Sequence, residues 1–180
     1  MKPIYKYLST KIKNLKIKAT NDNIRQIVKG ELDRLGHDAD LNHIDVSEVT
    51  DMHALFSCYK YDYLGSKYKD LNPDISLWDV SNVINMKQMF YLCKNFNSDI
   101  SGWNVSKVED MHSMFSWCEK FNQDISGWDV SKCEDMEFMF NECKKFNKDI
   151  SNWDVRKVKE YEHIFNNCPI KEEYKPHFVK

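Results

Sequence analysis

The chain has 180 residues, of which 42% are hydrophobic and 30% are charged, with a mean hydropathy of −0.66. This is the length of one domain, with enough apolar residues for a core. No apolar run approaches the roughly 20 residues that cross a bilayer, so the sequence excludes a membrane-spanning helix. The net charge of −2 is unevenly placed, because residues 1–34 carry nine Lys or Arg and only three Asp or Glu.

The first segment, residues 1–40, is expected to be a basic N-terminal cap. It contains neither an uninterrupted apolar segment nor a small-residue cleavage site, so we expect no signal peptide and a cytoplasmic location. A helix is predicted near residues 22–35, with Asn21 or Asp22 as its N-cap and Gly36 as its stop. The apolar residues at helical spacing are Ile24, Ile27, Val28, Leu32 and Leu35.

Residues 41–168 repeat with a period of 25. The invariant columns include Trp78, Trp103, Trp128 and Trp153; Phe90, Phe115, Phe140 and Phe165; and Cys93, Cys118, Cys143 and Cys168. A looser copy, Ile44–Cys58, precedes them and is separated by an insertion near residues 59–72. The sequence therefore contains five copies, of which the first and the last are atypical.

A period of this length predicts a leucine-rich-repeat-like solenoid, in which every copy seals its neighbour. Within a copy, Trp103–Val105 is predicted to be a short parallel strand with alternate residues inward. Residues 107–120 have apolar spacings of three and four, which predict a short helix or 3-10 turn. Ser106 and Glu109 have the spacing of a capping box. Residues 169–180 are expected to form the C-terminal cap, with Phe178 as its anchor.

The consensus FNxDISxWDVSxVxxMxxMFxxCxxF resembles the repeat of BspA-like leucine-rich-repeat proteins, the mycoplasma-type surface lipoprotein repeat of about 25 residues. The likeness covers residues 41–168. Members of that family are commonly bacterial surface proteins tied to adhesion and protein binding. The resemblance implies a solenoid that binds other macromolecules, and it is the only reason to consider a surface location.

The sequence predicts no metal site, cofactor or catalytic centre. The Cys column has no C-x-x-C pair and no His at ligand spacing, so its members are expected to be buried, reduced thiols. Nucleophile, phosphate-binding and zinc-protease motifs are absent, and we expect the protein not to be an enzyme. The Trp column is expected to be core, whereas Trp117 lies off the periodic positions and is a candidate surface contact.

Outward residues of the predicted strands are candidates for a binding face on the concave side. They are Asp79, Asn104, Asp129 and Asp154, with Ser81, Ser106, Ser131 and Arg156 beside them. Stacked like charges disfavour folding, so an Asp column needs a compensating reason. One explanation is structural, because Asp accepts hydrogen bonds from turn amides. The other is an acidic strip for a basic partner or a cation.

The leading hypothesis is a non-enzymatic protein-binding module whose protein partner the sequence does not identify. Its surface would be the strand face or the insertion loop, which holds Tyr59, Tyr61, Tyr63 and Tyr68. A second hypothesis is nucleic-acid binding by the basic segment, through Lys6, Lys11, Lys13, Lys16, Lys18 and Arg25. A third is a small phage or host-conflict inhibitor. The sequence leaves the oligomeric state open.

Overall fold

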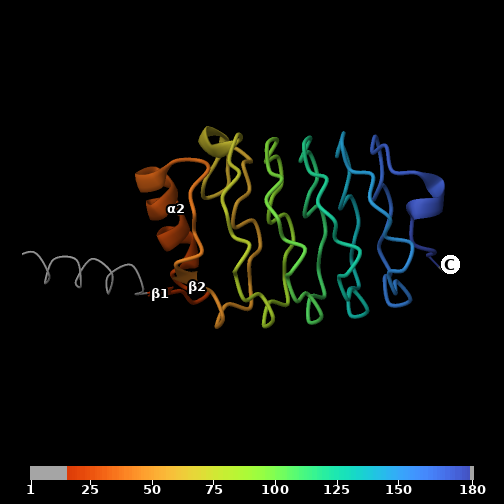
Figure 1. Cartoon of the computed structure of the whole chain (residues 1–180), viewed down its shortest axis with the longest axis horizontal. Helices are drawn as coiled ribbons and strands as arrows, with labels where there is room; N and C mark the ends of the chain where they lie inside the picture. The colour runs from red at the N-terminus through yellow and green to blue at the C-terminus, as the bar shows by residue number, and fades with distance from the viewer. Residues whose placement is uncertain (1–15, 179–180) are drawn as a thin grey trace, which may run out of the picture.

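The computed structural model describes residues 16–178 (Figure 1). Its regular elements are few and short. In chain order they are strand β1 (Ile17–Lys18), helix α2 (Ile24–Leu35), strand β2 (Ile44–Asp45), 3-10 helix η1 (Ser66–Tyr68) and 3-10 helix η2 (Glu172–Tyr174). β1 and β2 pair in parallel, with Ile17 opposite Ile44. Turns and irregular backbone make up most of the rest.

The predicted leucine-rich-repeat-like solenoid of short parallel strands and short helices is wrong. Trp103–Val105 is not a strand, although Trp103 and Val105 are buried and Asn104 is exposed as expected. Amides at and after this segment form local turns instead. The Trp103 N–H donates to the Ile100 carbonyl (3.1 Å), and the Val108 N–H donates to the Val105 carbonyl (2.9 Å). These amides are therefore not available for a strand ladder. Residues 107–120 contain no helix either.

Helix α2 covers the N-terminal end of the molecule (Figure 1). It buries Ile24, Val28 and Leu32, which recur every four residues and so share one face. Its N-cap is Asn23 rather than the predicted Asn21 or Asp22, and Gly36 ends it in a left-handed conformation with φ of 94°.

Asn21 has another role just before α2. Its side chain donates to the Thr50 hydroxyl (2.8 Å) and accepts from the Thr50 amide (2.9 Å). These two hydrogen bonds fix the start of the helix against the first copy of the sequence motif.

From residue 44 onward the backbone forms turn-rich coils that lie side by side along the long axis (Figure 1). Each coil follows one copy of the 25-residue motif. Isolated parallel bridges connect neighbouring coils, Asp51 with Asn85, Asn85 with Asp110, Asp110 with Asp135, and Asp135 with Glu160. The contacts between coils are therefore backbone contacts at single positions, without the continuous strands that were predicted.

Alternate amides in the coils point in different directions. The amides of Ser113 and Phe115 donate to the next coil, to the carbonyls of Glu137 (2.9 Å) and Met139 (3.0 Å). The amides between them donate within their own coil to the residue three positions earlier, as Met114 does to the Met111 carbonyl (3.1 Å). Apolar spacings of three and four thus come from consecutive turns here, which explains why a helix was expected.

Each coil also places non-glycine residues in the left-handed region of backbone conformation, which no helix tolerates. One column is Gln88, Ser113, Phe138 and His163, with φ of 55–57°. The other is Leu92, Trp117, Glu142 and Asn167, with φ of 53–65°. Such a conformation costs an L-residue roughly 1–2 kcal/mol. In the inner coils the amides at these positions donate to the next coil, as Ser113 does to the Glu137 carbonyl (2.9 Å), and these hydrogen bonds help to offset the cost.

Aromatic rings form two ladders through the core. Phe56, Phe90, Phe115, Phe140 and Phe165 stack with successive centroid distances of 5.4, 5.7, 5.7 and 5.8 Å. Phe96, Phe121 and Phe146 form a second ladder with distances of 6.0 and 5.7 Å. Since the rings are almost all fully buried, the ladders supply much of the apolar area that holds neighbouring coils together.

The Trp column is core, as expected. Each indole is at most 5% exposed and donates its Nε1–H to a backbone carbonyl of the preceding copy. Trp128, for example, donates to the Ile100 carbonyl at 3.2 Å. Trp therefore fills the core and satisfies a carbonyl at the same time, which a Phe at this position would leave unpaired.

Candidate functional site

The residues predicted to line a concave acidic face make local turns. The side-chain Oδ1 of Asp79, Asn104, Asp129 and Asp154 each accepts the amide two residues later, at 3.1, 3.2, 3.0 and 3.3 Å. Those amides belong to Ser81, Ser106, Ser131 and Arg156. Ser106 therefore donates its amide to the Asn104 side chain and caps no helix. An Asn serves as well as an Asp here, which supports the structural explanation of the column.

The carboxylates of this column stay charged more readily than usual. Hydrogen bonds from Ser131 hold the pKa of Asp129 below its ordinary value. At Asp154 the Arg156 guanidinium, with Nε at 2.8 Å and Nη2 at 2.7 Å, lowers the pKa to about 2. Arg156 thus neutralises the last carboxylate of the column.

A second column consists of Asp74, Asp99, Asp124 and Asp149, each followed two positions later by Ser. Asp99 accepts both the amide (3.0 Å) and the hydroxyl (2.7 Å) of Ser101, and the other three have the same arrangement. The pKa of each Asp is lowered by these bonds. One oxygen of each carboxylate is therefore already engaged in hydrogen bonds within its own turn.

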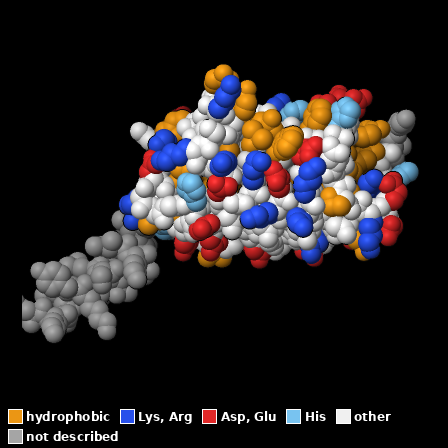
Figure 2. All heavy atoms as spheres, turned by 90° about the horizontal axis from the view of Figure 1, so that it is seen from above, with side chains coloured by type: hydrophobic (Ala, Val, Ile, Leu, Met, Phe, Trp, Pro, Cys, Tyr) orange, Lys and Arg blue, Asp and Glu red, His pale blue; other side chains and the backbone are white. Residues whose placement is uncertain are grey.

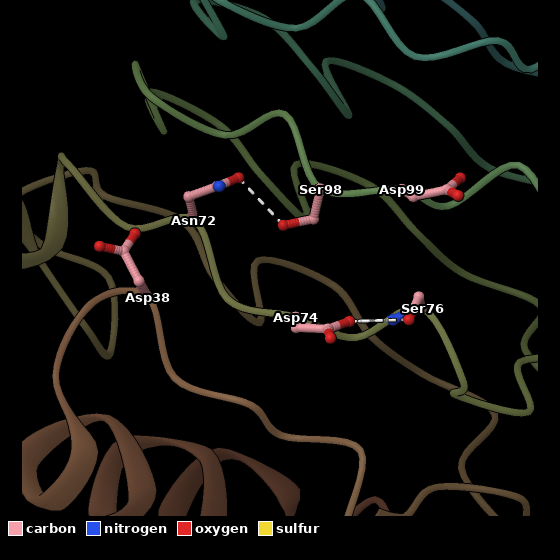
Figure 3. A pocket seen from close by; sticks show the side chains of 6 residues that line it. All are labelled: Asp38, Asn72, Asp74, Ser76, Ser98 and Asp99. Carbon is pink, nitrogen blue, oxygen red and sulfur yellow. Dashed lines mark hydrogen bonds between the residues drawn. The ribbon is translucent and has the colours of Figure 1, made fainter.

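A shallow hollow lies beside this column (Figure 3). Its lining residues are Asp38, Asn72, Asp74, Ser76, Ser98 and Asp99. Figure 3 shows two pairs among these polar groups, Ser98 Oγ with Asn72 Oδ1 (3.0 Å) and Ser76 with Asp74, whereas Asp99 accepts from Ser101. Among residues 16–178 no group of three or more His, Cys, Asp and Glu side chains is placed to hold a metal ion.

An asparagine column was not predicted, although it joins the coils at this hollow. Asn97 N–H donates to Asn72 Oδ1 (2.8 Å), and Asn122 N–H donates to Asn97 Oδ1 (2.8 Å). Asn147 and Lys171 continue the series at 3.1 and 3.0 Å. The signal was present in the sequence as an Asn two positions before each Asp-Ile-Ser, at a period of 25, in Leu71-Asn72 and then in the Phe-Asn dipeptides that end at Asn97, Asn122 and Asn147.

The cysteines are reduced and structural. Cys93, Cys118 and Cys143 are fully buried, and each thiol lies 3.0 Å from the Phe carbonyl of the preceding coil. Burial raises the pKa of all three thiols, and raises that of Cys168 to about 11. They are therefore poor nucleophiles and poor metal ligands.

The basic residues predicted for nucleic-acid contact do not form a patch in the described part of the chain. Lys6, Lys11 and Lys13 lie outside the described residues. Lys18 pairs with Glu48 (2.6 Å), and the Arg25 guanidinium donates to the His53 carbonyl. Lys16 is exposed.

The insertion loop carries the most exposed aromatic residues. Tyr59, Tyr61 and Tyr63 are 39, 75 and 48% exposed. Tyr68 differs, because it is 1% exposed and donates its hydroxyl to Asp33 (2.6 Å). Tyr68 therefore anchors η1 on the side of α2 and leaves the loop tyrosines at the surface.

Two loop tyrosines continue onto the neighbouring coils. Tyr59 contacts the rings of Tyr61 (5.5 Å between centroids) and Tyr91 (6.1 Å). Leu92 follows Tyr91, and its amide bonds to the Ser116 carbonyl (3.0 Å) directly before the 37% exposed Trp117. We call Tyr59, Tyr61, Tyr91, Leu92 and Trp117 the aromatic patch. Figure 2 shows hydrophobic side chains gathered among charged ones on the face seen from above.

No helix among residues 16–178 is long and apolar enough to cross a membrane. No curated protein and no solved structure matches the chain. One family model matches residues 59–176, about two thirds of the sequence. That family is related to BspA-like proteins, but the match does not confirm a leucine-rich repeat. The chain therefore belongs to the family described as Mycoplasma protein of unknown function, DUF285.

Proposed function

We propose that this chain is a non-enzymatic protein-binding module and that the aromatic patch is its recognition surface. The observation that carries the proposal is a series of surface side chains that runs from the insertion loop across two coils, in which Tyr59, Tyr61 and Trp117 are exposed and Tyr91 and Leu92 are half-buried. Tyr and Trp are enriched at protein interfaces, where they supply large contact areas at low entropic cost. The expectation of a cytoplasmic location stays a prediction.

One charged pair lies next to the patch, as at the rim of an interface. Lys94 and Glu119, two residues beyond Leu92 and Trp117, pair at 2.8 Å. Energetically important interface residues are commonly surrounded by polar contacts that exclude water. The Asp columns are weaker candidates for recognition, because their acceptor atoms are engaged in turns.

The test uses substitutions copied from other copies of the motif. Tyr91→Asn takes the residue found at Asn141, and Trp117→Asn takes the residue found at Asn167, so both fit their local backbone. Leu77→Asn is the matched control, because Leu77 is 74% exposed outside the patch and Asn152 occupies its column.

The intact chain and both variants are used to capture proteins from lysate, and bound proteins are identified by mass spectrometry. We expect the wild type and Leu77→Asn to retain the same partner, and the Tyr91→Asn/Trp117→Asn double variant to lose at least tenfold in retention. Thermal unfolding of each variant checks that the fold is intact. Equal retention by all three proteins would contradict the proposal.

A further inference from the structure

The last coil presents backbone donors that find no acceptor among the described residues. In each inner coil, alternate amides donate to the next coil, as Trp117 N–H does to the Asn141 carbonyl (2.8 Å). The corresponding amides of the last coil belong to Tyr161, His163, Phe165 and Asn167. Among residues 16–178, none of these amides has a hydrogen-bond acceptor. Within the part of the chain that the structure describes, this series of inter-coil bonds therefore ends at the last coil without acceptors.

The C-terminal segment covers only part of this end. The Phe178 ring stacks on Tyr161 (4.5 Å between centroids), and Lys175 Nζ lies 5.8 Å from the Phe165 ring. His163 and Asn167 are exposed, and Phe165 is half-buried. We call the amides of His163, Phe165 and Asn167 the open edge.

The open edge offers donors without matching acceptors. The carbonyls of His163 and Phe165 already accept the amides of Asn166 and Cys168, both at 3.1 Å. Two molecules meeting edge to edge would therefore place donor against donor, so a symmetric tail-to-tail pairing is disfavoured. The opposite end of a second molecule is covered by α2. The edge requires a free segment of chain that supplies alternate carbonyls, as in strand addition to a sheet edge.

We propose that the open edge binds residues 1–15 of a second copy of this chain, giving head-to-tail assembly. Three alternate donors need about five residues of extended chain, and 15 residues can extend over roughly 50 Å. The assembly uses a different surface from the aromatic patch, so either proposal can fail alone.

Charge favours this occupant. Glu160, Glu162, Glu172 and Glu173 are exposed at or beside the last coil. Lys171 is exposed there too and Lys175 pairs with Glu172 (2.5 Å), so that four Glu and two Lys give residues 160–178 a net charge of −2. Residues 1–15 contain four Lys and no Asp or Glu. Opposite charges steer such segments together and make the contact sensitive to salt.

The test is a charge-swap experiment on the full chain, read by light scattering after size exclusion over a range of concentrations. The head variant is Lys6→Glu/Lys11→Glu/Lys13→Glu, and the tail variant is Glu162→Lys/Glu172→Lys/Glu173→Lys. The control variant, Lys120→Glu/Lys132→Glu/Lys145→Glu, changes the net charge as the head variant does, at exposed lysines of the coils.

We expect the wild type and the control variant to form oligomers at low salt that dissociate at high salt. The head and tail variants are each expected to be monomeric, and their mixture to recover the oligomers. Amide hydrogen exchange at His163, Phe165 and Asn167 should slow in the assembled protein. A wild type that stays monomeric at all concentrations, oligomers that neither variant dissolves, or assembly without protection of these amides would each overturn the proposal.

Discussion

The two ends of the stacked coils are finished in different ways. At the N-terminal end, α2 packs Ile24, Val28 and Leu32 into the core and Arg25 donates to the His53 carbonyl. At the C-terminal end, the amides of His163 and Asn167 meet no acceptor among the described residues. Along the face that carries Ser113, Phe115 and Trp117, alternate amides donate toward the C-terminal side, whereas other amides, such as that of Glu109 on the Ile84 carbonyl (2.8 Å), donate back to the preceding coil. On this face the N-terminal end therefore needs a donor, which Arg25 of α2 supplies, whereas the amides at the C-terminal end need acceptors.

The largest expected effect is a difference in the free energy of unfolding between a substitution in an inner coil and the corresponding substitution at the open end. Phe115→Ala should reduce the free energy of unfolding by about 3–5 kcal/mol, because Phe115 is fully buried between two ladder neighbours. Phe165→Ala should cost about 1–2 kcal/mol, because Phe165 is half-buried and stacks only on Phe140 in this ladder. Urea unfolding of both variants measures the difference, and equal losses would show that the C-terminal end is as well covered as the middle.

An intermediate effect is expected at the covered end. Arg25→Ala should cost about 1.5–3 kcal/mol, because the His53 carbonyl loses a charged donor. Gln26→Ala, on an exposed position of the same helix, is the control and should be nearly neutral. Thermal and urea unfolding measure both variants. If Arg25→Ala matches its control, then α2 covers this end by apolar packing alone.

The smallest expected effect is on the pH dependence of stability. It should be the same for Asp124 in an inner coil and for Asp149 near the C-terminal end. The hydroxyl and amide of Ser126 hold the pKa of Asp124 below its ordinary value, and Ser151 does the same for Asp149. A lowered folded-state pKa contributes stability that is complete above the unfolded value of about 3.9 and is lost as pH falls through the folded pKa.

Asp124→Asn and Asp149→Asn should both keep the turn, since the amide oxygen of Asn also accepts, as Asn104 does in the neighbouring column. Each variant should therefore lose less melting temperature than the wild type between pH 6 and pH 3. Melting curves across this pH range provide the measurement. A variant that is as acid-sensitive as the wild type would show that the carboxylate charge does not contribute through the turn.

The sequence predicted the core better than the backbone. The Trp, Phe and Cys columns are buried because periodic apolar residues must face inward whatever the backbone does. The backbone was mispredicted, because spacings of three and four arise from a helix and from consecutive turns alike. The left-handed residues Ser113 and Trp117 distinguish the two, and neither is a glycine or a usual left-handed residue.

The candidate surfaces were predicted in part. Exposure of Tyr59 and Tyr61 could be expected from an insertion, but the burial of Tyr68 depends on Asp33, 35 positions earlier. The extension of the patch to Tyr91 and Leu92 depends on how neighbouring coils align. The unpaired amides of the last coil could not be predicted either, because the direction of the inter-coil hydrogen bonds follows from the turns.

The most direct test is amide hydrogen exchange on the protein at low concentration and high salt, where head-to-tail contacts are weakest. The account predicts slow exchange for the amides of Phe138, Phe140 and Glu142, which donate to the last coil at 3.1, 2.9 and 2.9 Å. It predicts fast exchange for the corresponding amides of His163, Phe165 and Asn167. Equal protection of the two sets would contradict an edge of unpaired amides at the C-terminal end.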